Sequence, residues 1–379
     1  METTDFIVIG AGIAGSSAAA ELALKGRVVL LERESQPGYH TTGRSAATYE
    51  PFDGSDKIRR LILSSGPFLE NPPADFCDGP LLSPRGTLCL FREGQDEQFE
   101  KYHEVMSSVT DEFRVIAPDE IMRVLPILKP DYAVKAIHGS TAQDIDVHAL
   151  HQGYLRKLKA NGGTVVLNAE VEGIRRSDGG GDWQVASRAG EFQAPVVVNA
   201  AGAWCDVVAE MAGVAPVGLE PRRRNAVLIN LPDGIDPSGW PMTFGPDPAF
   251  YFKPDAGRLM VSPEDAIPSP PCDARPDDID IAIAIDRFET ATTVTVARPE
   301  HTWAGLRSFV ADEMLVAGYD PIATGFFWLA GQGGYGIETS PSMAAITGAL
   351  VTGQPFPDSV SAFGLDADDL SPKRLFAND

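Results

Sequence analysis

The chain has 379 residues, enough for two domains or for one large domain with an elaborate insertion, and enough to bury a sizeable core. Its 44% hydrophobic and 22% charged residues are typical of an ordered globular protein and exclude disorder as the dominant state. The 31 Lys and Arg against 53 Asp and Glu give 31 − 53 = −22, a net charge that would repel nucleic-acid phosphates and anionic headgroups. We therefore expect no nucleic-acid partner.

The clearest predicted unit opens the chain. Residues 5–9 are an apolar β run, the turn Gly10-Ala11-Gly12-Ile13-Ala14-Gly15 follows, and residues 16–25 favour a helix. A second β run over 27–31 is followed by Glu32. This order is typical of a dinucleotide-binding βαβ unit, in which the glycines admit a pyrophosphate to the helix N-terminus and the acidic residue accepts hydrogen bonds from a ribose. An acidic residue there disfavours a 2′-phosphate, so NAD and FAD are the two candidates.

The following elements indicate a chain that leaves the first domain and returns to it. Residues 52–140 mix helical and β patterns and predict a separate lobe, and residues 210–305 contain short β runs that predict an antiparallel sheet. A helix over 146–161 and β runs at 163–167 and 196–202 extend the first sheet. The predicted helices of the lobe are 57–65, 96–107 and 118–125, and the predicted strands of the second sheet are 225–230, 249–252, 258–261 and 292–298, with a loop at 263–276.

The expected fold class is thus α/β, or α+β in two domains. A Rossmann-like dinucleotide-binding domain comprises residues 1–50, 141–209 and 306–379. A substrate-binding domain, built on the antiparallel sheet with helices, comprises residues 51–140 and 210–305.

A second glycine-rich turn lies near the C-terminus. It reads Gly331-Gln332-Gly333-Gly334-Tyr335-Gly336, follows β runs at 314–319 and 326–330, and precedes a predicted helix over 340–351. Its backbone N–H groups could bind a second polar part of an extended cofactor. Two such turns at opposite ends of the chain favour FAD over NAD.

The remaining sequence signals concern compartment and metals. The four cysteines, Cys77, Cys89, Cys205 and Cys272, are far apart, form no Cys-x-x-Cys pair and suit a reducing compartment. No apolar run is long enough to cross a bilayer, and the first residues lack the positive charge of a signal peptide. We expect a cytoplasmic protein with no metal site and no integral membrane contact.

Several motifs, in the same order along nearly the whole chain, resemble the D-amino-acid oxidase superfamily of FAD enzymes, and within it most closely the bacterial D-arginine dehydrogenases. Besides the two glycine turns, these motifs are Gln36-Pro37-Gly38-Tyr39-His40-Thr41-Thr42-Gly43-Arg44-Ser45-Ala46-Ala47, His151-Gln152-Gly153-Tyr154-Leu155-Arg156, Asn199-Ala200-Ala201-Gly202-Ala203-Trp204-Cys205-Asp206 and His301-Thr302-Trp303-Ala304-Gly305-Leu306-Arg307-Ser308-Phe309.

The resemblance implies non-covalent FAD and a two-electron oxidation. In such a reaction a hydride passes from the amino-acid Cα to flavin N5, and water then hydrolyses the imino acid to a 2-oxo acid and ammonia. By resemblance, the residues that bind FAD are Gly10, Gly12, Ile13, Ala14, Gly15, Glu32, Arg33, Thr42, Gly43, Arg44, Ser45, Ala46, Val171, Ala201, Gly202, Trp204, Gly331, Gly333, Gly334, Tyr335, Gly336 and Ile337.

The resemblance also assigns the substrate contacts. Arg224 and Arg307 match the family's clamp on the substrate carboxylate, a role that a planar guanidinium fills well, and Tyr251 matches its hydroxyl partner. Gly334 matches the position whose carbonyl accepts a hydrogen bond from the substrate amine. No side-chain base is required by this arrangement.

Three positions depart from the arginine-specific pattern. Thr87 stands where a carboxylate would pair the substrate guanidinium, Thr48 replaces a histidine, and Asp53 replaces a lid tyrosine, although Asp53 or Glu50 could supply a substitute carboxylate. We therefore expect an FAD-dependent dehydrogenase or oxidase for a small-molecule amino acid, the D-enantiomer with a neutral side chain. Secondary amines such as sarcosine, 2-hydroxy acids and a flavin-binding protein without turnover stay as alternatives, and the sequence does not indicate the electron acceptor.

Overall fold

The computed structural model describes residues 1–177, 180–247 and 249–376. A six-stranded sheet forms one half of the molecule, with the strand order β10-β3-β2-β14-β22-β21. Its strands are β10 (Thr164–Val166), β3 (Val28–Leu31), β2 (Phe6–Ile9), β14 (Val196–Asn199), β22 (Phe326–Ala330) and β21 (Val316–Tyr319). All neighbours are parallel except β21, which runs antiparallel to β22. Buried parallel strands of this kind need apolar residues on both faces, which explains their unbroken Val, Ile, Leu and Phe runs.

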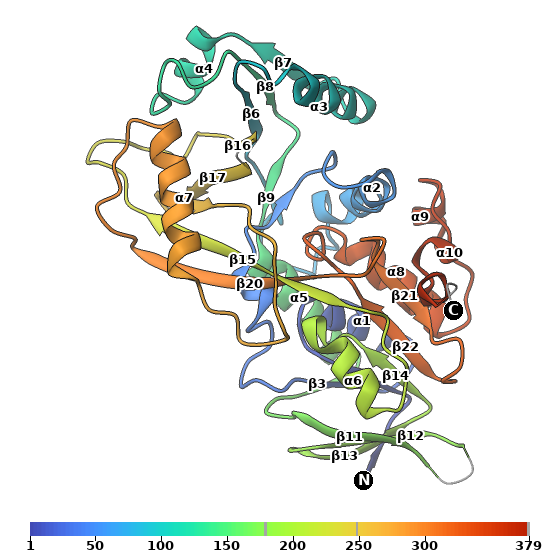
Figure 1. Ribbon diagram of the computed structural model, residues 1–379. Coiled ribbons are helices and arrows are strands. Elements are labelled where there is room, and N and C mark those ends of the chain that lie inside the picture. The colour runs from blue at the N-terminus through green and yellow to red at the C-terminus, as the bar shows by residue number, and fades with distance from the viewer. Residues whose placement is uncertain (178–179, 248, 377–379) are drawn as a thin grey trace.

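Helices cover one face of this sheet (Figure 1). The first, α1 (Ile13–Leu22), packs between α5 (Val147–Ala160) and α8 (Ser340–Val351), and its alanines let the helices approach closely. The other face carries a small sheet and the helix α6 (Cys205–Met211). The strands of that small sheet are β1 (Glu2–Thr3), β13 (Gly190–Ala194), β12 (Trp183–Ser187) and β11 (Val171–Arg176). The predicted βαβ unit at the N-terminus is confirmed.

The second large sheet is mostly antiparallel, as predicted for residues 210–305. Its order is β19-β15-β18-β17-β16-β6-β8-β7, with β20 paired to β15, and the β16–β6 pair is parallel. The strands are β19 (Ile267–Pro268), β15 (Glu220–Ile229), β18 (Arg258–Ser262), β17 (Ala249–Asp255), β16 (Met242–Pro246), β6 (Thr87–Phe91), β8 (Lys135–Gly139), β7 (Phe113–Ile116) and β20 (His301–Phe309).

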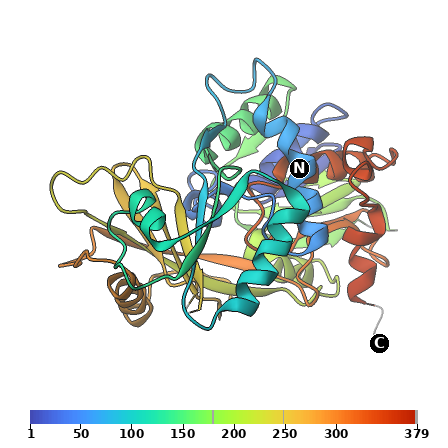
Figure 2. The same cartoon turned by 90° about the horizontal axis from the view of Figure 1, so that it is seen from above.

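A three-stranded sheet and the remaining helices complete the fold. The strands β4 (Thr48–Tyr49), β9 (Gln143–Ile145) and β5 (Leu82–Pro84) form the small sheet. The helices are α2 (Asp56–Glu70), α3 (Asp96–Val109), α4 (Pro118–Val124), α7 (Asp278–Ala291), α9 (Asp358–Ser361) and α10 (Ala367–Leu370). Seen from above, α7 and the C-terminal helices lie at opposite ends of the molecule (Figure 2). No helix of the described ranges is long and apolar enough to span a bilayer.

Two sequence expectations differ from the fold. The sequence does not predict helix α7, because residues 279–285 alternate between Ile and small or acidic residues as in a strand. The helix forms because the Asp277 side chain caps the Ile279 N–H at 3.0 Å. Its buried residues, Ile281, Ala284 and Phe288, follow helical spacing. The predicted strand at 292–298 is also wrong. Residue Thr292 makes one isolated bridge to Leu128, and the next strand, β20, begins at His301.

Candidate active site

The N-terminal glycine turn brings three chain segments into close contact. Gly10 has φ +101°, and a Cβ there would lie 2.5 Å from the carbonyl oxygen of Ala200. A Cβ on Gly15 would lie 1.8 Å from the carbonyl oxygen of Gly10. A Cβ on Gly12 would lie 3.2 Å from the hydroxyl oxygen of Thr42, which accepts the Ile13 N–H at 2.9 Å. Gly10 and Gly15 therefore close the turn, and Gly12 lines the adjoining cavity without a side chain.

Glu32 stands at the carboxyl end of β3, as predicted. Its Oε2 accepts the Ala11 N–H at 2.9 Å and its Oε1 accepts the Glu34 N–H at 3.0 Å. Burial raises the pKa of this carboxyl, and the two backbone donors oppose that rise. Because a carboxylate oxygen can accept a second hydrogen bond, Glu32 can still bind hydroxyl groups from the cavity that it lines.

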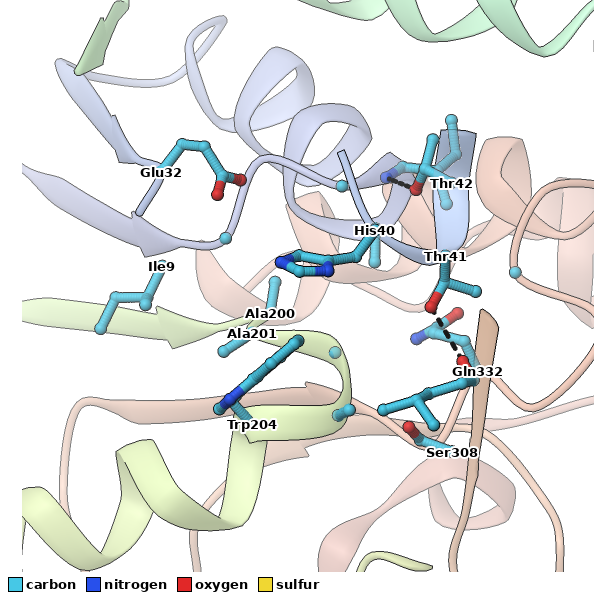
Figure 3. Close-up of a pocket in the computed structure, with 18 of the residues that line it drawn as sticks. Ile9, Glu32, His40, Thr41, Thr42, Ala200, Ala201, Trp204, Ser308 and Gln332 are labelled. Atoms are coloured by element: carbon cyan, nitrogen blue, oxygen red, sulfur yellow. Dashed lines mark hydrogen bonds between the residues drawn. The ribbon is translucent and has the colours of Figure 1, made fainter. Parts of the chain in front are cut away.

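A cavity of about 220 Å³ runs from this turn to the second glycine turn. His40, Trp204 and Glu32 point into it from three different segments (Figure 3). The His40 ring lies 4.8 Å from the Trp204 ring, and its Nε2 is 2.9 Å from a Glu34 carboxylate oxygen. Its Nδ1 is buried and has no hydrogen-bond partner among the described residues. The predicted residues that line the cavity are Gly10, Gly12, Ile13, Ala14, Glu32, Arg33, Thr42, Ser45, Val171, Ala201, Gly202, Trp204, Gly331, Gly333, Gly334, Gly336 and Ile337.

Five predicted cofactor residues do not line this cavity. Gly15 packs under Gly10, and the Arg44 guanidinium is bound by Ala274, Ala304 and Asp273. The other three are Gly43, Ala46 and Tyr335, of which Ala46 lines the neighbouring cavity. Four further residues line the first cavity and were not assigned from the sequence: Thr41, Leu306, Ser308 and Gln332. The only sequence feature that could have indicated them is their position inside the matched motifs.

The residues present fit an adenine dinucleotide with a flavin. Gly12, at the N-terminus of α1, lines the cavity and has no side chain, so a pyrophosphate could approach its backbone, and the Glu32 carboxylate would take a ribose. Gly331 and Gly333 have φ +65° and +54°, so their turn leaves backbone groups facing the far end of the same cavity. The orphaned Nδ1 of His40 supplies one more group for a polar ligand.

A second cavity, of about 440 Å³, adjoins the first. Ser45, Gly334 and Ile337 line both cavities. The second cavity lies against β16, β17, the start of α2 and the α3 face that carries Tyr102. A ligand in it would therefore lie beside one in the first cavity.

The predicted carboxylate clamp faces this second cavity. Arg224 on β15 and Arg307 on β20 belong to paired strands, with Arg224 opposite Gly305 and Arg307 opposite Arg222. The Arg224 Nε donates to the carbonyl oxygen of Asp265. Burial lowers the pKa of Arg224, and the positive charge of Arg307 adds to this. Each guanidinium group disfavours the positive charge of the other. An anion bound by both would relieve this repulsion, so the pair makes a strong anion site.

Tyr251 and Gly334 lie beside the two arginines. Tyr251 on β17 is buried and lines the cavity with the two arginines. A Cβ on Gly334 would come within 3.1 Å of an Arg307 guanidinium nitrogen, so a larger residue would crowd the clamp. Thr48 and Asp53 line the cavity too, whereas Thr87 is buried and does not reach its surface.

The inner wall of the second cavity is largely apolar and aromatic. Phe52, Tyr102 and Phe244 form an edge-to-face cluster, with ring centroids 6.2 Å apart for Phe52–Tyr102 and 5.7 Å for Tyr102–Phe244. Val105 and Met242 extend this wall. The hydroxyl groups of Tyr102 and Thr87 are buried and have no hydrogen-bond partner among the described residues.

Four carboxyl groups also line the second cavity, and sequence reasoning proposed only two of them. Asp53 and Glu264 are exposed to it, and Glu264 has a positive φ of +57°. Glu50 and Glu338 are more enclosed, and the Glu50 N–H donates to Glu338 Oε2 at 2.9 Å. Burial raises the pKa of Glu338 well above its ordinary value and that of Glu50 to about 7. Glu264 was missed because it reaches the cavity from a loop with no local motif.

The fold and the paired cavities are those of a flavoprotein oxidoreductase. The chain belongs to the FAD dependent oxidoreductase family (DAO), which it matches over residues 5–350. FAD is its cofactor, held non-covalently as is typical of that family.

Individual relatives are distant. FAD-dependent oxidoreductase domain-containing protein 1 of Bos taurus is 24% identical, over 92% of this chain and 81% of its own. Among solved structures, L-proline dehydrogenase from P. horikoshii superimposes with a TM-score of 0.82 at 20% identity, covering 100% of this chain and 99% of that one. Glycine oxidase from Geobacillus kaustophilus gives a TM-score of 0.80 at 20% identity, covering 96% and 98%. The described residues contain no cluster of metal-ligating side chains.

Proposed function

We propose that the protein oxidises the Cα–N bond of a small amino acid, with Arg224 and Arg307 holding the substrate carboxylate beside the FAD site. The observation that carries the proposal is the pair of guanidinium groups in a cavity whose lining shares Ser45, Gly334 and Ile337 with the cofactor cavity. FAD, when bound, supplies the two-electron acceptor. This chain's residues supply binding and orientation, from which much of the rate derives.

We further propose a D-amino acid with a neutral side chain. The motif resemblance supports the D-enantiomer, and the aromatic wall formed by Phe52, Tyr102 and Phe244 supports an uncharged side chain. Thr87 stands where arginine-specific enzymes carry a carboxylate, and it does not line the cavity, so no charge from this position pairs a substrate guanidinium. Glycine and sarcosine would leave most of a cavity of about 440 Å³ unfilled.

The test is an anaerobic absorbance scan of the purified protein. D- and L-amino acids, N-methylglycine and 2-hydroxy acids are added in turn while the flavin band is followed. Bleaching by neutral D-amino acids but not by D-arginine is the expected result. Bleaching by N-methylglycine or a 2-hydroxy acid alone would move the activity to that class, because the arginine pair recognises only a carboxylate. No bleaching by any of these compounds would contradict the proposed function.

A further inference from the structure

An amino acid enters such a site with a protonated amine. The ammonium nitrogen has no free lone pair to form the C=N bond, so one proton must leave before the Cα–H bond can be oxidised. The arginine pair cannot accept that proton. Given the proposed function, the carboxyl groups of the second cavity are the candidates to accept it.

Glu50 is held in a defined position at the edge of the cavity. It follows β4 and precedes α2, and the Thr48 hydroxyl donates to its Oε1 at 2.5 Å. Its own N–H donates to Glu338 Oε2 at 2.9 Å, so a buried carboxyl fixes its backbone. No described residue makes a hydrogen bond to the second carboxyl oxygen, Oε2, and Glu50 lines the cavity. One oxygen is therefore anchored and the other is free to bind a ligand.

The charged groups around Glu50 come from several elements, and Arg59 on α2 and Lys101 on α3 line the same cavity. Asp53 lies on the same segment, Glu264 follows β18, and Glu338 lies before α8 with Arg307 near it. The charge of Lys253 on β17 favours an anionic Glu50, but its Nζ already donates to the Ala46 carbonyl and to Asp144, each at 2.6 Å. Burial, with the negative charge of Asp53, raises the pKa of Glu50 to about 7. A group with such a pKa takes up and releases a proton readily at neutral pH.

We propose that Glu50 is the general base that takes one proton from the substrate ammonium, and that Glu338 is a positioning residue that fixes the Glu50 backbone. One N–H bond of the ammonium breaks and its electron pair stays on nitrogen. An O–H bond forms on Glu50 Oε2, so a charged pair becomes a neutral pair. The step needs no oxidant, and it leaves the amine with the lone pair that the oxidation requires.

The other three carboxyls suit this role less well. Asp53 is exposed, and its Oδ1 accepts the Gly54 N–H at 2.7 Å. Burial raises the pKa of Glu264 too, but the charges of Arg224 and Arg307 oppose that rise, and no described residue makes a hydrogen bond to its carboxylate. Glu338 is 5% exposed, burial raises its pKa well above the ordinary value, and its Oε2 already accepts the Glu50 N–H at 2.9 Å.

The first test compares flavin reduction in wild type and Glu50→Gln by anaerobic stopped flow, with the amino acid that bleaches the flavin best. At pH 7 we expect the variant to reduce its flavin roughly 100-fold more slowly, or worse. The deficit should shrink toward pH 9, because a growing fraction of the substrate then arrives already deprotonated. The matched control is Glu191→Gln, since Glu191 on β13 is exposed and lines neither cavity. It should follow the wild-type profile.

The second test needs only the wild type. 2-Aminoisobutyrate has no Cα–H and cannot be oxidised, and isobutyrate lacks the amine. Both are titrated against the oxidised flavin spectrum between pH 6 and 8. The ratio of the isobutyrate Kd to the 2-aminoisobutyrate Kd should rise at least tenfold from pH 6 to pH 8, because an anionic Glu50 attracts the ammonium and repels the plain carboxylate.

The outcomes separate the two proposals. Bleaching by no amino acid would remove the proposed function itself. If a substrate reduces the flavin of Glu50→Gln and of wild type with the same pH profile, only the role of Glu50 is overturned. The same holds if the rate of flavin reduction in Glu50→Gln is lower by a factor that does not change with pH. A constant ratio between the two analogues from pH 6 to 8 would overturn it as well.

Discussion

The carboxylate of Asp265 holds Asn225 by two hydrogen bonds. Asp265 Oδ1 accepts the Asn225 N–H at 2.8 Å and Oδ2 accepts the side-chain Nδ2 at 2.6 Å. The carbonyl of the same Asp265 accepts the Nε of the neighbouring Arg224. Asn225 is fully buried and also bonds Asp280 and the Asp277 N–H. One loop residue thus fixes the strand position from which Arg224 reaches into the second cavity.

Replacing Asp265 by Ala should weaken carboxylate binding without removing FAD. The buried Asn225 would lose two acceptors at a cost of roughly 1–3 kcal/mol in stability, and the loop whose backbone carbonyl binds the Arg224 Nε would no longer be fixed to Asn225. We expect the Kd for isobutyrate to rise about tenfold or more, measured by titration of the flavin spectrum. The exposed Asp286 on α7 gives the control Asp286→Asn. Equal Kd values for Asp265→Ala and wild type would show that Arg224 is oriented without this contact.

Replacing Arg307 by Met should abolish most activity while the protein keeps its flavin. The guanidinium has no hydrogen bond to another described residue, so it is available to a substrate carboxylate. We expect a loss of about 3 kcal/mol or more in transition-state binding, measured as kcat/KM. Arg222→Met on the paired strand is the control, because Arg222 is bound by Glu220 and Glu313 outside the cavity. An unchanged kcat/KM for Arg307→Met would refute the clamp.

Replacing Gly15 by Ala should remove FAD. The added Cβ would lie 1.8 Å from the Gly10 carbonyl oxygen, so the turn between β2 and α1 must open. Overpacking of this kind costs up to about 3 kcal/mol, and it moves the backbone that faces the pyrophosphate. The ratio of flavin to protein absorbance and the Tm report the two effects. Gly239→Ala meets no atom within 4 Å and should behave as wild type.

The raised pKa of Glu50 predicts how stability changes with pH. A carboxyl whose pKa in the folded protein is about 7, above the unfolded value of 4.5, favours the folded state while it is protonated. That contribution is complete below pH 4.5 and is lost as pH rises toward 7, with an upper bound of about 3 kcal/mol. Urea titrations at pH 5 and pH 7.5 should show a smaller decline for Glu50→Gln than for wild type. Identical declines would mean that Glu50 titrates normally in the folded chain.

The sequence predicts well those parts of the fold that are encoded locally. The β2–α1–β3 unit and Glu32 follow from apolar runs, a glycine turn and spacing within some thirty residues. Arg224 and Arg307 could be assigned because they lie in matched motifs, and both line the second cavity. Their roles stay predictions until the variants are measured.

Other features depend on contacts between distant segments, which local patterns do not encode. Glu264 reaches the second cavity from a loop, and Lys253 is tied to Ala46 and Asp144. Helix α7 has an alternating sequence typical of a strand, and its packing against β15 and β18 decides otherwise. Arg44 lies in a cofactor motif, yet its guanidinium holds the 273–274 loop. Burial and partners, rather than residue type, decide what these side chains do.

The shared lining of the two cavities links their occupants thermodynamically. Ser45, Gly334 and Ile337 each face both spaces, so a molecule that orders them from one side prepares them for a molecule on the other. Such coupling is reciprocal: a carboxylate ligand should strengthen the binding of FAD by the same free energy by which FAD strengthens the binding of the ligand. The protein without substrate would then bind FAD less tightly than the protein with substrate. Simple carboxylates in a buffer would help it to keep its FAD.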